Sequence, residues 1–288
     1  MERLQAAIAK ARAAREARGD LPRPASPSAI AGVTAQEGVT QQADATAHPS
    51  DADQAWAALR EIQVSEQLLI DNRIVSTMGR NAEAMEFDRL RTRVLQRMQQ
   101  NGWTRLAVTS PGPGCGKSTI TLNLGFGLAR QEGSRVMVLE MDMRRPSMAR
   151  ILGAGAGRDL SRVIAGEAAP GEHLLRARDN LAIGISQHVD DSAELLQSAT
   201  AASAIDQIAA LYQPSIMLFD MPPFRVSDDV LSFAGKVDCV LIVAAAGQTS
   251  MDELDECERE LSAQTPVLGV VLNKCRFKDR DAEYYYGN

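Results

Sequence analysis

The sequence is poor in aromatic residues and has no surplus of positive charge. Aromatic residues make up 4% of the 288 residues, whereas hydrophobic residues make up 45%, so the core must be mainly aliphatic. The formal net charge of −6 argues against a protein that coats nucleic acid, because phosphate binding requires a basic surplus. We expect no nucleic-acid partner.

Long apolar runs and a signal peptide are also missing. The longest apolar runs, such as residues 237–246, are too short to span a bilayer as a helix. The N-terminus is charged and lacks the apolar core of a signal peptide. We therefore expect a cytoplasmic protein that meets a membrane only peripherally or through a partner.

Cysteines are few, and none are paired in sequence. The four, Cys115, Cys239, Cys257 and Cys275, form no C-x-x-C pair and have no histidine nearby. We interpret them as reduced thiols rather than disulfides or metal ligands, which fits the cytoplasm.

The chain divides into five segments by composition. Residues 1–20 have the pattern of a short basic helix, which is either a solvated alanine-rich helix or a docking helix for a partner or an anionic membrane. Residues 21–53 have the composition of a disordered linker. Residues 54–100 are an ordered lead-in that ends in a helix over 84–100. Residues 101–280 form the main domain, and residues 281–288 form a tyrosine-rich tail.

Apolar strands alternate with helices through the main domain. Continuous apolar runs of this kind predict a parallel sheet covered on both faces, with ligands at the carboxyl ends of the strands. The expected strands are 105–109, 135–140, 181–185, 215–219, 237–243 and 267–272, and the expected helices are 117–131, 192–211 and 250–263.

A glycine-rich loop follows the first of these strands and leads into a helix at Lys117. This order of strand, loop and helix is typical of a phosphate loop, in which backbone N–H groups and the helix N-terminus face phosphates. A helix end carries only about half a positive charge, so Lys117 and Mg²⁺ must supply the rest, with Ser118 as a ligand of the ion. We predict that the loop binds ATP through Gly112, Pro113, Gly114, Cys115, Gly116, Lys117, Ser118 and Thr119.

The loop departs from the strict template at one position. Pro111 stands where the first glycine is expected, with Gly112 beside it. The fold class predicted by the intact end of the motif is α/β of the P-loop NTPase type. It has a mostly parallel central sheet, helices on both faces, and a largely disordered N-terminal region before it. Cys115 is either a small residue that fits the loop or a redox-sensitive switch.

Carboxylates follow two later strands. One strand ends at Glu140 with Asp142 just beyond it, and another leads into Asp220. In a parallel sheet these residues emerge at the same edge as the phosphate loop, where they can hold magnesium and orient an attacking hydroxyl. Alternatively, Glu140 and Asp142 are loop carboxylates paired with Arg144 or Arg145.

These motifs together resemble the bacterial tyrosine kinases (BY-kinases) of capsule and exopolysaccharide export. The resemblance extends from about residue 87 to the C-terminus. It rests on residues 136–146, on Asp220-Met221-Pro222-Pro223, and on the consecutive tyrosines Tyr284, Tyr285 and Tyr286. It implies an ATP-dependent protein-tyrosine autokinase that regulates polysaccharide synthesis and export by phosphorylating this tyrosine cluster.

The same resemblance assigns roles and partners. It implies catalytic roles for Lys117, Asp142 and Asp220, magnesium ligation by Ser118, Asp142, Asp220 and Glu140, and an adenine contact by Asn273. Asp142 would be the general base. A homo-oligomer is expected, together with a membrane-bound polysaccharide chain-length regulator as activator, which would recruit the chain to the inner face of the cell membrane.

Three departures from the family pattern keep alternatives open. Glu140 replaces an aspartate, Met221 replaces a serine or threonine, and of the subunit-contact motif Glu-x-x-Arg-x-x-Arg only Arg91 remains, with Met85 and Asp88 at its other positions. The alternatives are a cargo-positioning partition ATPase and a catalytically weak, nucleotide-gated scaffold. A partition ATPase would carry a lysine at the place of Gly112.

Overall fold

The computed structural model describes residues 50–77, 82–155 and 157–275. The predicted helix 1–20, most of the predicted linker and Tyr284, Tyr285 and Tyr286 lie outside these residues. The predicted end of the linker was wrong, because helix α2 (Asp51–Ala58) starts before residue 54. Ser50 and Asp53 form a reciprocal capping box that fixes this helix start.

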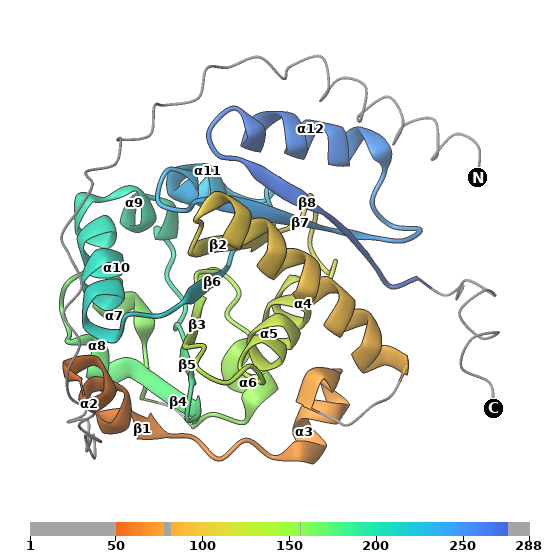
Figure 1. The fold of residues 1–288 in the computed structure, drawn as a ribbon. Helices are drawn as coiled ribbons and strands as arrows, with labels where there is room; N and C mark the ends of the chain where they lie inside the picture. Colours follow the sequence, from red (N-terminus) through yellow and green to blue (C-terminus); the bar gives the residue numbers. More distant parts are fainter. Residues whose placement is uncertain (1–49, 78–81, 156, 276–288) are drawn as a thin grey trace, which may run out of the picture. The chain divides into compact units, whose positions relative to one another are not determined.

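A central sheet runs through the described part of the chain in the order β1-β4-β5-β3-β6-β2-β7-β8 (Figure 1). All neighbouring strands are parallel except β4 and β5, which are antiparallel. The strands are β1 (Arg60–Glu61), β2 (Arg105–Thr109), β3 (Val136–Glu140), β4 (Leu174–Arg178), β5 (Leu181–Gly184), β6 (Ile216–Asp220), β7 (Cys239–Ala245) and β8 (Val267–Asn273).

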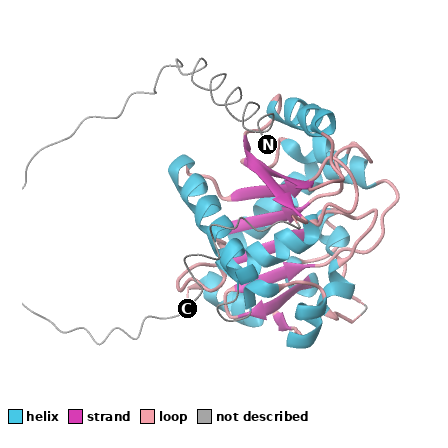
Figure 2. Cartoon of the chain, turned by 90° about the vertical axis from the view of Figure 1, so that its right-hand side faces the viewer, coloured by secondary structure: helices cyan, strands magenta, loops and turns pink. Residues whose placement is uncertain are grey.

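Helices cover both faces of this sheet (Figure 2). One face packs against α3 (Glu66–Asp71), α4 (Ala82–Asn101), α5 (Lys117–Leu128) and α6 (Met148–Leu152). The other face packs against α2, α7 (Leu160–Ile164), α9 (Ser192–Gln197), α10 (Ala199–Tyr212), α11 (Asp229–Ala234) and α12 (Met251–Ser262). The short helices η1 (Val75–Thr77) and α8 (Pro170–His173) complete the described elements. The predicted fold class, a mostly parallel sheet of the P-loop NTPase type, is confirmed.

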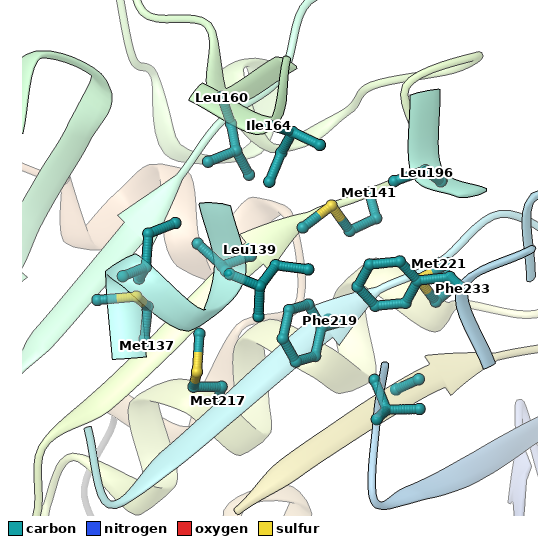
Figure 3. Close-up of a cluster of buried hydrophobic side chains, with 14 of the residues drawn as sticks. Met137, Leu139, Met141, Leu160, Ile164, Leu196, Met217, Phe219, Met221 and Phe233 are labelled. Atoms are coloured by element: carbon teal, nitrogen blue, oxygen red, sulfur yellow. The ribbon is translucent and has the colours of Figure 1, made fainter. Parts of the chain in front are cut away.

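The two cores arise from side-chain alternation along the buried strands. In β3, Val136 and Val138 belong to the core beneath α4 and α5, whereas Met137 and Leu139 belong to the opposite core. Successive strand residues face opposite sides of a sheet, so a strand that is apolar throughout serves both cores. Figure 3 shows Met137 and Leu139 packed among the buried side chains of the second core.

Two predictions about elements were wrong in detail. The helix expected over 192–211 is two helices, because Ser198 adopts an extended backbone and its hydroxyl accepts from Ala201 N at 3.0 Å as the N-cap of α10. β1 and the antiparallel β4 were not predicted from the sequence. Within the described ranges, no helix combines the length and the apolarity needed to cross a membrane.

Candidate nucleotide-binding site

A cavity of about 580 Å³ lies where β2, β3 and β6 end. Three segments form it: the glycine-rich loop with the start of α5, the loop from β3 through α6, and the loop after β6. The lining residues are Pro113, Gly114, Gly116, Lys117, Ser118, Thr119, Asp142, Arg144, Arg145, Ser147, Arg150, Ile151, Pro222, Pro223 and Val226.

The loop geometry depends on Gly116. Its φ is +95°, and a Cβ placed there would lie 2.3 Å from Nδ2 of Asn273. That amide donates to the carbonyl of Cys115 at 2.8 Å, so the end of β8 supports the loop. No side chain caps the start of α5, which leaves the first helical N–H groups available for an anion.

Lys117 and Asp142 meet inside the cavity. Nζ of Lys117 lies 3.8 Å from Oδ2 of Asp142, and their side chains are only 8% and 10% exposed. The backbone N–H of Arg145 donates to the other carboxylate oxygen at 3.2 Å. Burial raises the pKa of Asp142, while the Lys117 ammonium opposes this rise. The pair places a cation and a carboxylate side by side inside the cavity.

Asp220 lies fully buried beneath the lysine. Thr121 donates to its Oδ1 at 3.4 Å, but its Oδ2 has no hydrogen-bond partner among the described residues. Burial raises the pKa of Asp220 to about 7, and Lys117 and Ser118 oppose the rise. A buried oxygen without a partner is costly, so a divalent cation between Ser118 and Asp220 fits these residues.

Glu140 supports the wall of the cavity but does not line it. Its Oε1 accepts from the backbone N–H groups of Ser147 at 2.6 Å and Met148 at 2.8 Å, and its Oε2 accepts from Ser186 N at 3.1 Å. Burial raises its pKa to about 7. Oε1 therefore holds the start of α6 in place, and Oε2 holds the backbone just after β5. The alternative pairing of Glu140 with Arg144 or Arg145 does not occur among the described residues.

Arg144 is fixed by a carboxylate on a distant helix. Its Nε lies 3.2 Å from Oδ1 of Asp229, which is fully buried. The other oxygen of Asp229 accepts from the hydroxyl of Ser192. Helices α9 and α11 thus set the position of one cation at the cavity.

Met221 belongs to the core rather than to the cavity. It is fully buried and packs near Phe233 and Met141 beneath the strand ends (Figure 3). The loss of a hydroxyl at this position is a change in the apolar core, and the cavity-lining Pro222 follows it directly.

The structure brings most predicted site residues together. Asp220 and Glu140 lie behind the cavity, while Gly112, Cys115 and Asn273 shape its loop without lining it. Ser147, Arg150 and Asp229 were not predicted as site residues, because no local sequence motif marks them. Ser147 donates to the hydroxyl of Ser118 at 3.3 Å across 29 residues of sequence.

Comparison with known families identifies the fold group. The profile of the family described as "ParA: NUBPL iron-transfer P-loop NTPase" matches residues 103–286. The chain belongs to this P-loop NTPase family.

Curated relatives of this P-loop NTPase are named tyrosine-protein kinases. This chain is 28% identical over 247 residues to the putative tyrosine-protein kinase EpsB of Ralstonia nicotianae. The aligned residues cover 82% of this chain and 32% of EpsB. This chain is also 26% identical over 205 residues to the putative tyrosine-protein kinase CapB of Staphylococcus aureus. That alignment covers 70% of this chain and 88% of CapB. The predicted resemblance to bacterial tyrosine kinases is confirmed. The chain spans only 32% of the length of EpsB.

A solved structure shows the same fold. The chimerical protein CapA2B2 superposes with a TM-score of 0.65 at 23% identity, over 79% of this P-loop NTPase and 99% of the chimera. At this identity, the likeness concerns the fold. The roles of the individual site residues stay predictions.

Proposed function

We propose that this chain is an ATP-dependent protein-tyrosine kinase of capsule or exopolysaccharide biosynthesis, and that it phosphorylates its own Tyr284, Tyr285 and Tyr286. The observation that carries the proposal is the buried pair of Lys117 and Asp142 at the uncapped start of α5. The names of the curated relatives support tyrosine as the acceptor.

The proposed ATP site uses charge and backbone amides. Lys117 and the N–H groups at the start of α5 would hold the phosphates. Ser118, Asp142 and Asp220 would hold magnesium, and the unpartnered Oδ2 of Asp220 supports this assignment. Mg·ATP supplies the phosphoryl group and shields its negative charge during transfer. The adenine contact of Asn273 stays part of the proposal.

Asp142 is the proposed general base. It is the one carboxylate among the residues that line the cavity, whereas Asp220 and Glu140 lie behind it. Asp142 would take the proton of the tyrosine hydroxyl. At the same time the tyrosine oxygen would bond to the γ-phosphorus of ATP, and ADP would leave. Most of the catalytic effect would come from positioning and charge neutralisation.

The proposed partners are a second copy of the chain and a membrane-bound chain-length regulator that recruits it to the inner face of the cell membrane. The resemblance supports both. Asp88, at one position of the altered subunit-contact motif, pairs within the chain with Arg91 at 3.3 Å and with Arg130 at 2.9 Å. An oligomer contact at this helix face would use a different set of charges from the family motif.

Two alternatives lead to different outcomes. A partition-type ATPase would hydrolyse ATP without phosphorylating tyrosine, and a nucleotide-gated scaffold would only bind it. The commitment of Glu140 to backbone N–H groups favours the scaffold as the second candidate. We do not propose iron transfer for this chain, because its sequence has no paired cysteines that could hold an iron–sulfur cluster.

The deciding experiment maps phosphotyrosine by mass spectrometry after incubation with ATP and magnesium, with protein from a host that lacks tyrosine kinases. We expect phosphate on Tyr284, Tyr285 or Tyr286 in the wild type, and none in Lys117→Met. Lys236→Met removes a lysine outside the cavity and should keep the modification. Unmodified tyrosines with intact ATP binding, even with the activator present, would rule out the kinase.

A further inference from the structure

The cavity carries more positive charge than its own carboxylates neutralise. Four of its lining residues are basic and one is acidic. Lys117 pairs with Asp142, and Arg144 pairs with the buried Asp229. Two further arginines, Arg145 and Arg150, line the same cavity and form no ion pair with a carboxylate of the described residues.

Both of these arginines are exposed and available. The hydrogen bond between Arg145 and Asp142 comes from the Arg145 backbone N–H, although the guanidinium is near enough for its charge to lower the pKa of that carboxyl. The guanidinium of Arg150 contacts the side-chain oxygen of Asn72 at 3.3 Å, which leaves most of its donors unused. They lie on the wall formed by the loop after β3 and by α6, whereas the phosphate loop and Lys117 lie on another. The proposed phosphate site therefore does not account for them.

The third wall of the cavity is apolar. Pro222 and Pro223 follow β6 directly, and Val226, which is 52% exposed, completes this wall. Apolar side chains of this kind suit an aromatic ring. A ligand with a ring next to carboxylates would match the apolar wall and the two arginines at once.

We propose that Arg145 and Arg150 select tyrosine substrates with acidic residues just before the tyrosine, an inference that rests on the proposed kinase function. The chain's own tail has this character, since Asp281 and Glu283 precede Tyr284. In an extended peptide, alternate residues point to the same side, so both carboxylates would face one wall. The apolar wall would receive the tyrosine ring.

The test measures peptide binding by fluorescence anisotropy and phosphorylation rate with the full-length chain. The probe is a labelled synthetic peptide of residues 277–288, compared with the same peptide carrying Asp281→Asn and Glu283→Gln. The Arg145→Ala/Arg150→Ala variant should bind the acidic peptide about fivefold to tenfold more weakly, as expected for two exposed ion pairs. It should bind the neutral peptide as the wild type does. The wild type's preference for the acidic peptide should shrink in high salt.

Matched controls separate charge recognition from general effects. Arg162→Ala/Arg259→Ala removes the same charge from two exposed arginines outside the cavity and should change neither peptide's affinity. Arg145→Glu/Arg150→Glu should instead prefer a peptide with Asp281→Lys and Glu283→Lys. An equal loss for both peptides, or no loss at all, in the Arg145→Ala/Arg150→Ala variant would overturn the proposal. Binding without any phosphorylation would refute the kinase function but keep the acidic preference.

Discussion

Two glycines of the phosphate loop differ in what a side chain would meet: at Gly114 it would cause backbone strain alone, and at Gly116 it would also collide with Asn273. Gly114 and Gly116 both have positive φ, +73° and +95°, but a Cβ at Gly114 meets nothing within 4 Å, whereas one at Gly116 meets Asn273. An L-residue in this region costs about 1–2 kcal/mol. Gly116→Ala also displaces the Asn273 amide from Cys115, which adds about 0.5–1.5 kcal/mol.

We therefore expect Gly116→Ala to lose more unfolding free energy than Gly114→Ala, as measured by urea denaturation. ATP affinity, measured by calorimetry, should fall further in Gly116→Ala, since the loop loses its support from β8. Equal losses in the two variants would show that Asn273 does not hold the loop.

At the same scale, the sequence predicted the residues whose chemistry is local. Lys117 and Ser118 follow the glycine loop directly, and Asp142 and Asp220 follow apolar strands, so their positions could be read without the fold. Asp229 could not be predicted, because its partner Arg144 lies 85 residues away. The role of Glu140 was also hidden, since its three donors are backbone groups that only the fold brings together.

Among the elements, the buried parallel strands were predictable, whereas β1 and β4 were not. Every residue of β3 and β6 is buried, and a continuous apolar run reports such a strand. β4 contains Arg176 and Arg178 and is only partly buried, and β1 has two exposed residues. Their place depends on pairing with distant strands, which local composition does not reveal.

The break between α9 and α10 gives a prediction for one helix cap. Ser198→Ala removes the hydroxyl that accepts from Ala201 N, and we expect a loss of about 1 kcal/mol of unfolding free energy in urea. Ser262→Ala is the control, since that hydroxyl donates to a carbonyl at the exposed end of α12 and its loss should cost less. If Ser198→Ala matches this control, α10 does not depend on the cap.

For the whole molecule, two buried aspartates should affect stability in opposite directions. Asp229 has partners on both oxygens, whereas Oδ2 of Asp220 has none among the described residues. Without magnesium, Asp229→Asn should destabilise the fold by about 3 kcal/mol or more, because it leaves Arg144 and Ser192 poorly paired. Asp220→Asn should stabilise it, because it removes a buried charge that lacks a full set of partners.

The raised pKa of Asp220 determines whether its contribution to the free energy of unfolding rises or falls with pH. The pKa of Asp220 is about 7 in the fold against an ordinary value of 3.8, so between these values the folded state binds more protons than the unfolded chain. Its contribution to stability is therefore greatest at low pH and is lost as pH rises towards 7. Urea unfolding in EDTA from pH 5 to 8 should show a shallower loss of stability in Asp220→Asn than in the wild type.

Mg·ATP should reverse the advantage of that variant. A ligand that binds only the folded state raises the unfolding midpoint, and the rise grows with the logarithm of its affinity. The wild type keeps the carboxylate proposed to hold magnesium. We expect Mg·ATP to raise the thermal midpoint of the wild type by several degrees and that of Asp220→Asn by much less. A full shift in the variant would mean that Asp220 holds no magnesium. Greater stability without ligand, combined with a weaker response to ligand, would show that the buried carboxylate lowers the stability of the fold in order to bind the nucleotide.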